Sequence, residues 1–422
     1  MQYGIPQCIL MEEVKTMYLE KIKKELFDYL VSDGYQKKKV LMVIPDTTRT
    51  APVGKLVRIV KEVCNQSGAH LDLMIALGTH QPLSRETVFR HLGVDNEREY
   101  LEVFGETRCF NHTWNDPSSL VELGSLSPAL VSEVSNGLLE EEIKITINKK
   151  IFEYDHLMIL GPVFPHEIAG FSGGSKYFFP GISGPEMIDH THWLGALITN
   201  LNIIGKANNP VRSILDMGAS LVPIPVTNIA FVVHQNKIAG IFVGELRETW
   251  RKAVALSEKL HVVYKPHPYR KVIACAPKMY EDLWTGGKCM YKCEPVVEDG
   301  GELVIYAPHI TSLSYTHGHI LEEIGYHVRD YYLQNMEQYK EYPRAVLAVS
   351  TLIKGQGTYQ NGIERPRIKV ILATGIPPEV CEKVGLGYIN PESINLSEYE
   401  NKEDEGILLV PKAGETLYRL AE

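Results

Sequence analysis

Apolar and polar positions in the first half of the chain follow two periodicities, one typical of strands and one typical of helices. Lys39–Ile44 and Leu71–Leu77 are short, mainly apolar runs that predict buried strands. Between them, Pro52 to Gln66 places its apolar residues three or four apart, which predicts an amphipathic helix that ends before Gly68. Ser84 is a suitable N-cap for a short helix. The same patterns predict two further strands and a long helix at Asp155–Leu160, Thr227–Val233 and Glu245–Leu260.

A second series of strand and helix patterns begins near residue 271. Short β-branched runs again alternate with amphipathic stretches, and this alternation favours parallel sheets covered by helices on both faces. The predicted class is therefore α/β with mainly parallel sheets. The expected strands are Lys271–Ala276, Glu302–Tyr306, Arg344–Val349 and Ile368–Ala373, and the expected helices are Ile320–His327 and Pro378–Val384.

The segment Leu260–Arg270 holds two prolines, which interrupt any regular element, so it is the expected linker between two αβ domains. We place the boundary near residue 265, with one domain over residues 1–265 and a second over residues 266–422. We expect the functional site in a cleft between the two domains. We also expect a final helix of the second domain to pack back on the first.

Composition predicts a globular protein, and we expect it to bind neither nucleic acid nor membranes. The 422 residues are 44% apolar and 23% charged, which is ordinary for folded domains. A formal net charge of −9 gives no basic surface for nucleic acid or anionic lipid. No apolar stretch approaches the roughly 18–20 residues of a membrane span. Met1 to Glu13 lacks a basic region followed by an apolar block, so we expect no secretory signal.

Cysteine usage indicates the cellular compartment. The chain has seven cysteines, an odd number spread along its length. This usage is typical of reduced thiols, so the expected location is the cytoplasm.

Three loops of the first half follow predicted strands directly. In open α/β sheets, ligands bind beyond the carboxyl ends of the strands. That rule selects Asp46–Thr50, Gly78–Pro82 and Pro162–Lys176. Each loop offers a histidine, an arginine or a lysine, so the sequence predicts a functional site where the three loops meet.

The segment from Pro165 to Gly181 is glycine-rich and contains Lys176. A phosphate-binding P-loop has a glycine before its lysine and a serine or threonine after it. Here Ser175 and Tyr177 occupy those positions, so hydrolysis of a nucleoside triphosphate is not expected. Backbone amides near Gly173–Gly174 still suit an anion. A surface loop with a solvated lysine is the alternative interpretation.

Histidines recur in and after these loops. His80 and His166 each lie in a loop that follows a strand. A lone histidine is more often structural, but the repetition favours a catalytic or ligand role. His190 and His192 are two residues apart, so a zinc chelate is a further hypothesis, although the sequence offers no clear third ligand.

Two cationic side chains come from opposite halves of the chain. Arg49 lies three residues after Asp46, at the end of the first predicted strand. Lys288 follows Trp284, Thr285 and two glycines in the second half. If the halves face each other across a cleft, Arg49 and Lys288 would clamp one small anion from two sides. A helix cap with an exposed arginine is the alternative interpretation of the first segment.

Four groups of residues together resemble the nickel-pincer-nucleotide lactate racemase family, in an order and spacing that match over about 150 residues. The resemblance implies a cofactor made from a pyridinium mononucleotide, tethered as a thioamide to Lys176 in the loop that holds Gly173 and Gly174. It also implies nickel, held by carbon and two sulfurs of the cofactor and by a histidine that the family's spacing places at His192 rather than His190. The four groups are Pro45-Asp-Thr-Thr-Arg49, Gly78-Thr-His-Gln-Pro82, the loop from Pro165 to Lys176 with Pro180-Gly181, and His192.

The resemblance also implies roles for the residues around the cofactor. His80 and His166 match the family's acid/base pair, and Arg49 and Lys288 match residues that hold a substrate carboxylate. Asp46 is expected to orient a cofactor hydroxyl or a neighbouring side chain. In this chemistry the pyridinium ring takes hydride from C2 of a 2-hydroxy acid and returns it to the other face of the planar keto acid. Removal of hydride leaves a neutral ketone instead of negative charge beside a carboxylate.

The chain departs from the lactate enzymes at Trp284 and Thr285, where those enzymes place a tyrosine and a glutamine. The two glycines that follow add no side chain, so we expect room beside C3 for an acid larger than lactate. Thr285, Tyr291 and Gln356–Asn361 offer polar groups, if they line the cleft. Such groups favour a polyhydroxylated substrate such as an aldonic acid.

The sequence therefore predicts a cytoplasmic racemase or C2-epimerase of a 2-hydroxy acid, an isomerase that depends on cofactor-biosynthesis proteins for its nickel nucleotide. A racemase of lactate or another short acid is one alternative. A protein that binds the nickel nucleotide without turnover is a second alternative, and it needs Lys176 and His192 but neither His80 nor His166. The third alternative is a zinc-dependent hydrolase built on His190, His192 and another histidine.

Overall fold

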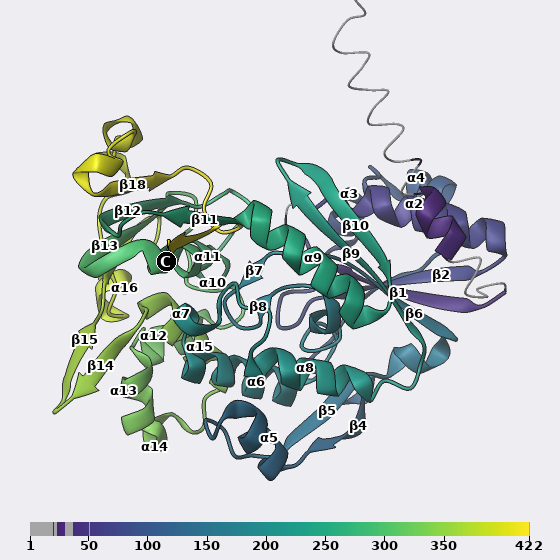
Figure 1. Ribbon diagram of the computed structural model, residues 1–422, viewed down its shortest axis with the longest axis horizontal. Helices are drawn as coiled ribbons and strands as arrows, with labels where there is room; N and C mark the ends of the chain where they lie inside the picture. The colour runs from purple at the N-terminus through teal and green to yellow at the C-terminus, as the bar shows by residue number, and fades with distance from the viewer. Residues whose placement is uncertain (1–19, 21–22, 30–36, 50, 422) are drawn as a thin grey trace, which may run out of the picture.

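The computed structural model describes residues 20, 23–29, 37–49 and 51–421 and contains two open sheets flanked by helices, seen on the right and the left of Figure 1. The segment Met1 to Glu13, considered above for a secretory signal, lies outside the described residues. All neighbouring strands of the first sheet are parallel except its last pair at one edge. Their order is β10 (Lys237–Gly244), β9 (Val226–His234), β6 (His156–Pro162), β1 (Lys39–Pro45), β2 (His70–Ala76) and β3 (Cys109–Asn111).

The central strands of this sheet are apolar because helices cover both faces. Every residue of β6 is buried, and β1 is exposed only at its first residue. Alternate residues of β1 pack on one face against α2 (Val53–Ser67), α3 (Arg85–Leu92) and α4 (Glu97–Phe104). The other residues of β1 pack on the opposite face with α6 (Pro185–Ile198) and α8 (Pro210–Ser220).

The second half forms a five-stranded sheet in which all neighbours are parallel. Two parallel or mainly parallel sheets with helices between them confirm the α/β class. The order of the second sheet is β17 (Gly387–Tyr388), β16 (Lys369–Thr374), β13 (Val297–Ala307), β12 (Tyr269–Cys275) and β18 (Ile407–Val410).

Helix α15 (Arg344–Lys354) joins the two halves. It packs against α6 of the first half, and residues 345–353 are all buried. One apolar core therefore contains side chains from both sheets, such as Ile159 and Ile305. The domain boundary near residue 265 stays a prediction.

Two sequence predictions about single elements are wrong. Arg344–Val349 is the first part of α15 and not a strand, because its apolar run continues for a further turn and is buried on every side. The expected final helix is instead the strand β19 (Leu417–Leu420), which runs parallel to β11 (Val262–Lys265). The predicted linker Leu260–Arg270 consequently contains a paired strand ahead of its two prolines.

Smaller elements complete the fold. Within the described residues, no helix combines the length and the apolar character that a membrane crossing needs. The six cysteines in the described part of the chain are free thiols.

The antiparallel pairs are β4 (Leu120–Leu126) with β5 (Ile143–Asn148), β7 (Pro165–His166) with β8 (Gly170–Phe171), and β14 (Gly357–Gln360) with β15 (Ile363–Pro366). The remaining α-helices are α5 (Pro128–Ser135), α7 (Asn200–Ile203), α9 (Leu246–His261), α10 (Leu283–Gly286), α11 (Lys288–Cys293), α12 (Gly318–Ile324), α13 (Arg329–Gln334), α14 (Met336–Tyr339) and α16 (Pro378–Lys383).

Candidate active site

Three loops meet at the carboxyl ends of β6, β1 and β2, which are neighbours in the first sheet. Residues 46–49 follow β1, residues 78–80 follow β2, and residues 163–176 follow β6. Together they line a pocket of about 150 Å³, and both halves of the chain contribute to it. From the second half the lining residues are Trp284, Thr285, Lys288, Tyr291, Val349 and Leu352.

The loop after β6 is shaped by close contacts at its two adjacent glycines. Gly173 has a φ of +82°, and a Cβ there would lie 2.7 Å from Cγ2 of Val163. Gly174 has a φ of +60°, and a Cβ there would lie 3.0 Å from the ring of Trp250. Arg212 fixes the loop by donating a hydrogen bond to the carbonyl oxygen of Gly173 at 3.1 Å. Gly173 lines the pocket, whereas Gly174 packs on Trp250 and supports the loop.

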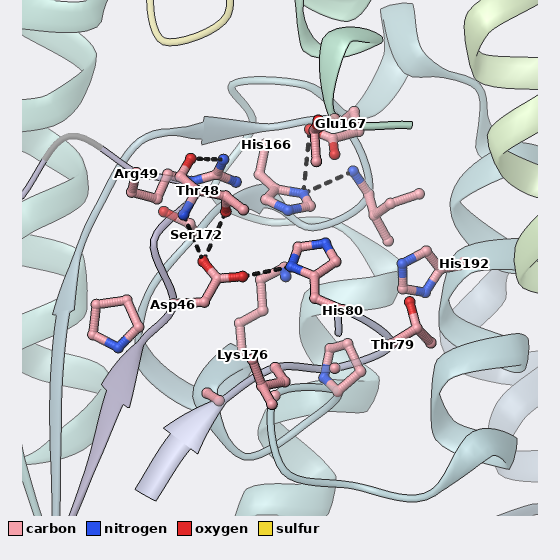
Figure 2. A pocket seen from close by; sticks show the side chains of 18 of the residues that line it. Asp46, Thr48, Arg49, Thr79, His80, His166, Glu167, Ser172, Lys176 and His192 are labelled. Atoms are coloured by element: carbon pink, nitrogen blue, oxygen red, sulfur yellow. Dashed lines mark hydrogen bonds and ion pairs between the residues drawn. The ribbon is translucent and has the colours of Figure 1, made fainter. Parts of the chain in front are cut away.

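Asp46 and His80 form a close pair, drawn with a dashed line in Figure 2. Nδ1 of His80 lies 2.5 Å from Oδ2 of Asp46, while Oδ1 of Asp46 accepts hydrogen bonds from the backbone N–H and the hydroxyl of Thr48. Burial alone would raise the pKa of Asp46, but the charge and the hydrogen bond of His80 hold it well below its usual value. In the neutral form of His80, the ionised Asp46 accepts the Nδ1 proton, so Nε2 keeps a lone pair and can act as a base.

His166 is in a different hydrogen-bonding state. Its Nδ1 accepts a hydrogen bond from the backbone N–H of Ile168 at 3.1 Å, and Oε2 of Glu167 lies 3.6 Å from the same nitrogen (Figure 2). A backbone N–H can only donate, so neutral His166 carries its proton on Nε2. Burial lowers the pKa of His166 well below its usual value, and the cations Lys176 and Arg49 lower it further.

His190 and His192 lie two residues apart on α6 and face different surroundings. His192 lines the pocket and donates its Nδ1 proton to the carbonyl oxygen of Ile188 at 2.7 Å, which leaves a lone pair on Nε2 for a metal ion. Burial lowers the pKa of His192 to about 4, so the ring is neutral at neutral pH. Nε2 of His190 lies 3.2 Å from Glu141, outside the pocket. The two rings therefore do not chelate one ion, and no group of three histidine, cysteine or acidic side chains in the described residues is arranged around a metal position.

Positive charge is concentrated at the pocket, where Arg49, Lys176 and Lys288 face the carboxylates of Asp46 and Glu167. Burial lowers the pKa of Lys288 to about 7 and that of Lys176 to about 8, and the charge of Arg49 acts in the same direction on both. Nζ of Lys288 is buried without a hydrogen-bond partner in the described residues. Desolvated cations are stabilised by a bound anion, so the pocket suits a carboxylate or a phosphate.

Trp284 and Thr285 line the pocket from the second half. The hydroxyl of Thr285 donates a hydrogen bond to Oδ1 of Asp282 at 2.8 Å, which caps α10. The ring of Trp284 lies against that of His317, with 4.9 Å between the ring centres. The wall on this side of the pocket is therefore a short side chain beside a fixed aromatic ring.

Two sequence predictions about the wall of the substrate pocket are wrong. A Cβ on Gly286 would meet Ile310 at 2.7 Å, and one on Gly287 would meet the hydroxyl of Tyr291 at 2.6 Å. These glycines therefore allow close packing inside the second half and add no room to the pocket. The polar run Gln356–Asn361 begins after α15 and continues into β14, outside the pocket.

Sequence reasoning misses two charged residues of the site. Glu167 lines the pocket beside His166, and its position next to that histidine was the available signal. Lys292 lies one helical turn after Lys288 on α11, and this spacing places both on one side of the helix. Nζ of Lys292 donates a hydrogen bond to the carbonyl oxygen of Pro165 at 2.5 Å. Lys292 thereby ties the second half to the loop that carries His166.

Comparison with known families agrees with this geometry. Residues 10–203 match the lactate racemase N-terminal domain. That range contains the three loops that line the pocket, together with His192 on α6. The first part of the chain is thus similar to the N-terminal domain of lactate racemases.

Two curated members of the family resemble the chain in sequence. The lactate racemase of Thermoanaerobacterium thermosaccharolyticum is 26% identical over 281 residues, which are 64% of this chain and 60% of that protein. The lactate racemase of Lactiplantibacillus plantarum is 28% identical over 182 residues, 41% of this chain and 38% of that protein. The chain thus matches less than two thirds of the length of each of these lactate racemases.

Two solved structures resemble the whole chain. A protein from Thermotoga maritima is 32% identical, with a TM-score of 0.86 over 96% of this chain and 98% of that chain. The lactate racemase apoprotein of Thermoanaerobacterium thermosaccharolyticum has a TM-score of 0.68 over 94% of this chain and 93% of that chain, at 18% identity. The second likeness, at that identity, concerns the fold alone.

Proposed function

We propose that this chain, which resembles lactate racemases, is a racemase or C2-epimerase of a 2-hydroxy acid. The observation that carries the proposal is that His80 and His166 reach one pocket from different loops, each beside a carboxylate, while Arg49 and Lys288 supply positive charge. Inversion at C2 uses two acid/base groups because the two configurations of the substrate direct their C2 hydroxyl groups to different sides of the pocket. A lone binding site for an anion would need the cations but not the paired imidazoles.

The chain's own residues would bind the substrate and move its hydroxyl proton. The guanidinium of Arg49 and the ammonium of Lys288 hold the carboxylate, which places C2 between the two histidines. Nε2 of His80 accepts the hydroxyl proton of one configuration, and Asp46 stabilises the resulting imidazolium through Nδ1. His166 exchanges the proton of the other configuration. Positioned groups of this kind each contribute about 10²- to 10⁴-fold to turnover.

The residues present fit the nickel-pincer nucleotide that the family resemblance implies. Lys176 has a buried amine whose pKa is lowered to about 8, so a useful fraction is neutral and nucleophilic near pH 7 and suits a covalent tether. His192 offers the lone pair of Nε2 to nickel. The cationic pocket beside Gly173 suits the phosphate of a mononucleotide. When bound, the group supplies an acceptor and donor of hydride for C2.

We also propose that the preferred substrate is larger than lactate, for example an aldonic acid epimerised at C2. The support is that Thr285 on the pocket wall is shorter than the glutamine that the lactate enzymes place there, and that Tyr291 also lines the pocket. We expect gluconate to exceed lactate, malate and phenyllactate in kcat/KM. Lactate as the best of the four would contradict this substrate proposal and leave the racemase proposal standing.

The tether is tested by intact mass and metal analysis of protein produced together with the cofactor-biosynthesis proteins. We expect one nucleotide-sized adduct on the peptide that contains Lys176. His192→Ala should keep the adduct and lose most of the nickel, because a nitrogen ligand is gone. His190→Ala is the matched control and should keep both. An adduct on another lysine would contradict the assignment.

The route is tested by inversion in heavy water. Hydride that leaves C2 and returns to it does not exchange with solvent, so the product should keep its original C2 hydrogen. Stoichiometric deuterium at C2 would indicate proton abstraction and contradict the proposed route. Loaded protein that inverts none of the four acids would favour the alternative of a nickel-nucleotide-binding protein without turnover.

We place the reaction in the cytoplasm, which agrees with the free thiols of the described cysteines.

A further inference from the structure

Glu167 is a pocket carboxylate for which the described residues provide no hydrogen-bond donor. The residue is 9% exposed and lines the pocket. Its one close polar contact in the described residues is with His166, whose Nδ1 lies 3.6 Å from Oε2 of Glu167. Its side chain is 12% exposed and lines the pocket, so the carboxylate can be reached by a partner that arrives during the reaction.

The hydrogen bond from Ile168 fixes His166 in a form that cannot exchange a proton through Nε2. To donate from Nε2, the ring must be an imidazolium, because loss of a proton from the neutral ring would leave an imidazolate. To accept at Nε2, the neutral ring must carry its hydrogen on Nδ1. Both active forms thus have a hydrogen on Nδ1, where the backbone N–H of Ile168 now donates at 3.1 Å.

On the basis of the proposed function, we infer that Glu167 is a positioning residue that accepts the Nδ1 hydrogen of His166 whenever His166 exchanges a proton with the substrate. His166 then releases the N–H of Ile168 and closes the 3.6 Å gap to Glu167. The hydroxyl proton of the substrate moves to or from Nε2, while the Nδ1 hydrogen stays on the ring and is shared with the carboxylate. Glu167 and His166 thereby form a second carboxylate–imidazole pair. The first pair is Asp46 and His80, in which Oδ2 of Asp46 and Nδ1 of His80 lie 2.5 Å apart.

The charges around His166 show why such a partner is needed. In the cofactor-free protein, the charges of Lys176, Arg49 and Lys292 all oppose a positive charge on the ring. Glu167 is the carboxylate in contact with it. A carboxylate on Nδ1 offsets part of that repulsion and fixes the ring with Nε2 available to the substrate.

One test needs neither cofactor nor turnover. Cofactor-free protein labelled with ¹⁵N-histidine reports the tautomer and the titration of His166, assigned by its loss in His166→Gln. We expect Nε2–H in the neutral ring, and we expect Glu167→Gln to lower the pH at which the ring becomes protonated. Glu141→Gln is the matched control, because Glu141 contacts His190 at 3.2 Å and should alter only that ring. Unchanged titration of His166 in Glu167→Gln would overturn the inference.

The kinetic test uses the cofactor-loaded enzyme and substrates of two sizes. Glu167→Gln should lower kcat by about tenfold or more for lactate and gluconate alike, with KM nearly unchanged, because Glu167 acts through His166. Glu167→Asp should restore part of the rate, and Glu141→Gln should match the wild type. A loss confined to the KM of gluconate would make Glu167 a substrate contact and overturn the inference. Absence of inversion by the wild type would instead defeat the proposed function, and the histidine titration would still decide the pairing.

Discussion

The charge state of Lys288 should set the pH range in which a carboxylate substrate binds. Burial, reinforced by Arg49, lowers the pKa of Lys288 to about 7, so the free enzyme carries this charge below that pH and loses it above. We expect KM for the acid to rise by up to about tenfold per pH unit above the pKa. Lys288→Arg keeps its charge and should have a flatter profile. KM measured from about pH 6 to pH 9 decides this, and a flat wild-type profile would contradict it.

At the residue scale, the positions of the site residues could be predicted but their hydrogen-bonding states could not. The carboxyl-end rule selects His80, His166 and Lys176 because three neighbouring strands direct their loops to one place. Whether Nδ1 of a histidine meets a carboxylate, as in His80, or a backbone N–H, as in His166, depends on loop geometry that residue types do not encode. The same limit explains Gly174, which packs on a tryptophan ring that lies far away in the sequence.

At the element scale, the last strand holds the second half against the end of the first. β19 pairs with β11, and Leu417 is fully buried. A stop after Thr416 removes this strand and should lower the free energy of unfolding by about 2–5 kcal/mol, the range for loss of one large core side chain. A stop after Ala421 is the control and should change little, because it keeps the hydrogen bond that the backbone N–H of Ala421 donates to the carbonyl oxygen of Lys265 at 2.9 Å. Urea unfolding of the two variants tests this, and equal midpoints would contradict a structural role for β19.

A short apolar run can belong to a strand or to a buried helix, and this explains why the first part of α15 was predicted to be a strand. Arg344–Val349 and a strand such as Lys39–Ile44 have the same density of apolar residues. The strand is covered on both faces of a sheet, whereas α15 is buried on every side between α6 and the second sheet. Periodicity distinguishes a helix only when one face meets water, so a fully buried helix gives no signal of that kind.

At the scale of the whole molecule, buried histidines should make the protein sensitive to acid. Burial lowers the pKa of four of them from 6.5 to about 4, so between these values the unfolded chain binds more protons than the folded one. Stability is therefore highest above about pH 6.5 and is lost as the pH falls, by up to about 2 kcal/mol per histidine at pH 5. The four residues are His112, His192, His261 and His317.

Thermal unfolding of the cofactor-free protein measures this loss. We expect Tm to fall by about 5 °C or more between pH 7.5 and pH 5. His112→Gln removes one of the four titrations away from the pocket and should make the decline shallower. A Tm that stays constant over this range would contradict the expectation.

The overall architecture was the most predictable level, because strand and helix patterns alternate along the whole chain and a parallel sheet follows from that alternation. The join between the halves was not predictable. It depends on α15 against α6, on Lys292 reaching Pro165, and on a strand pair made by residues more than 150 positions apart. Contacts of such long sequence separation leave no local pattern.

The pairing of β11 with β19 has a consequence for synthesis. Residues 262–265 leave the ribosome long before residues 417–420, so this strand pair forms only after residues 417–420 have been synthesised. The six-stranded sheet with its three loops can form earlier, since its strands end at residue 244. A nascent chain thus exposes the cationic side chains of these loops, Arg49 and Lys176, before the second half covers them.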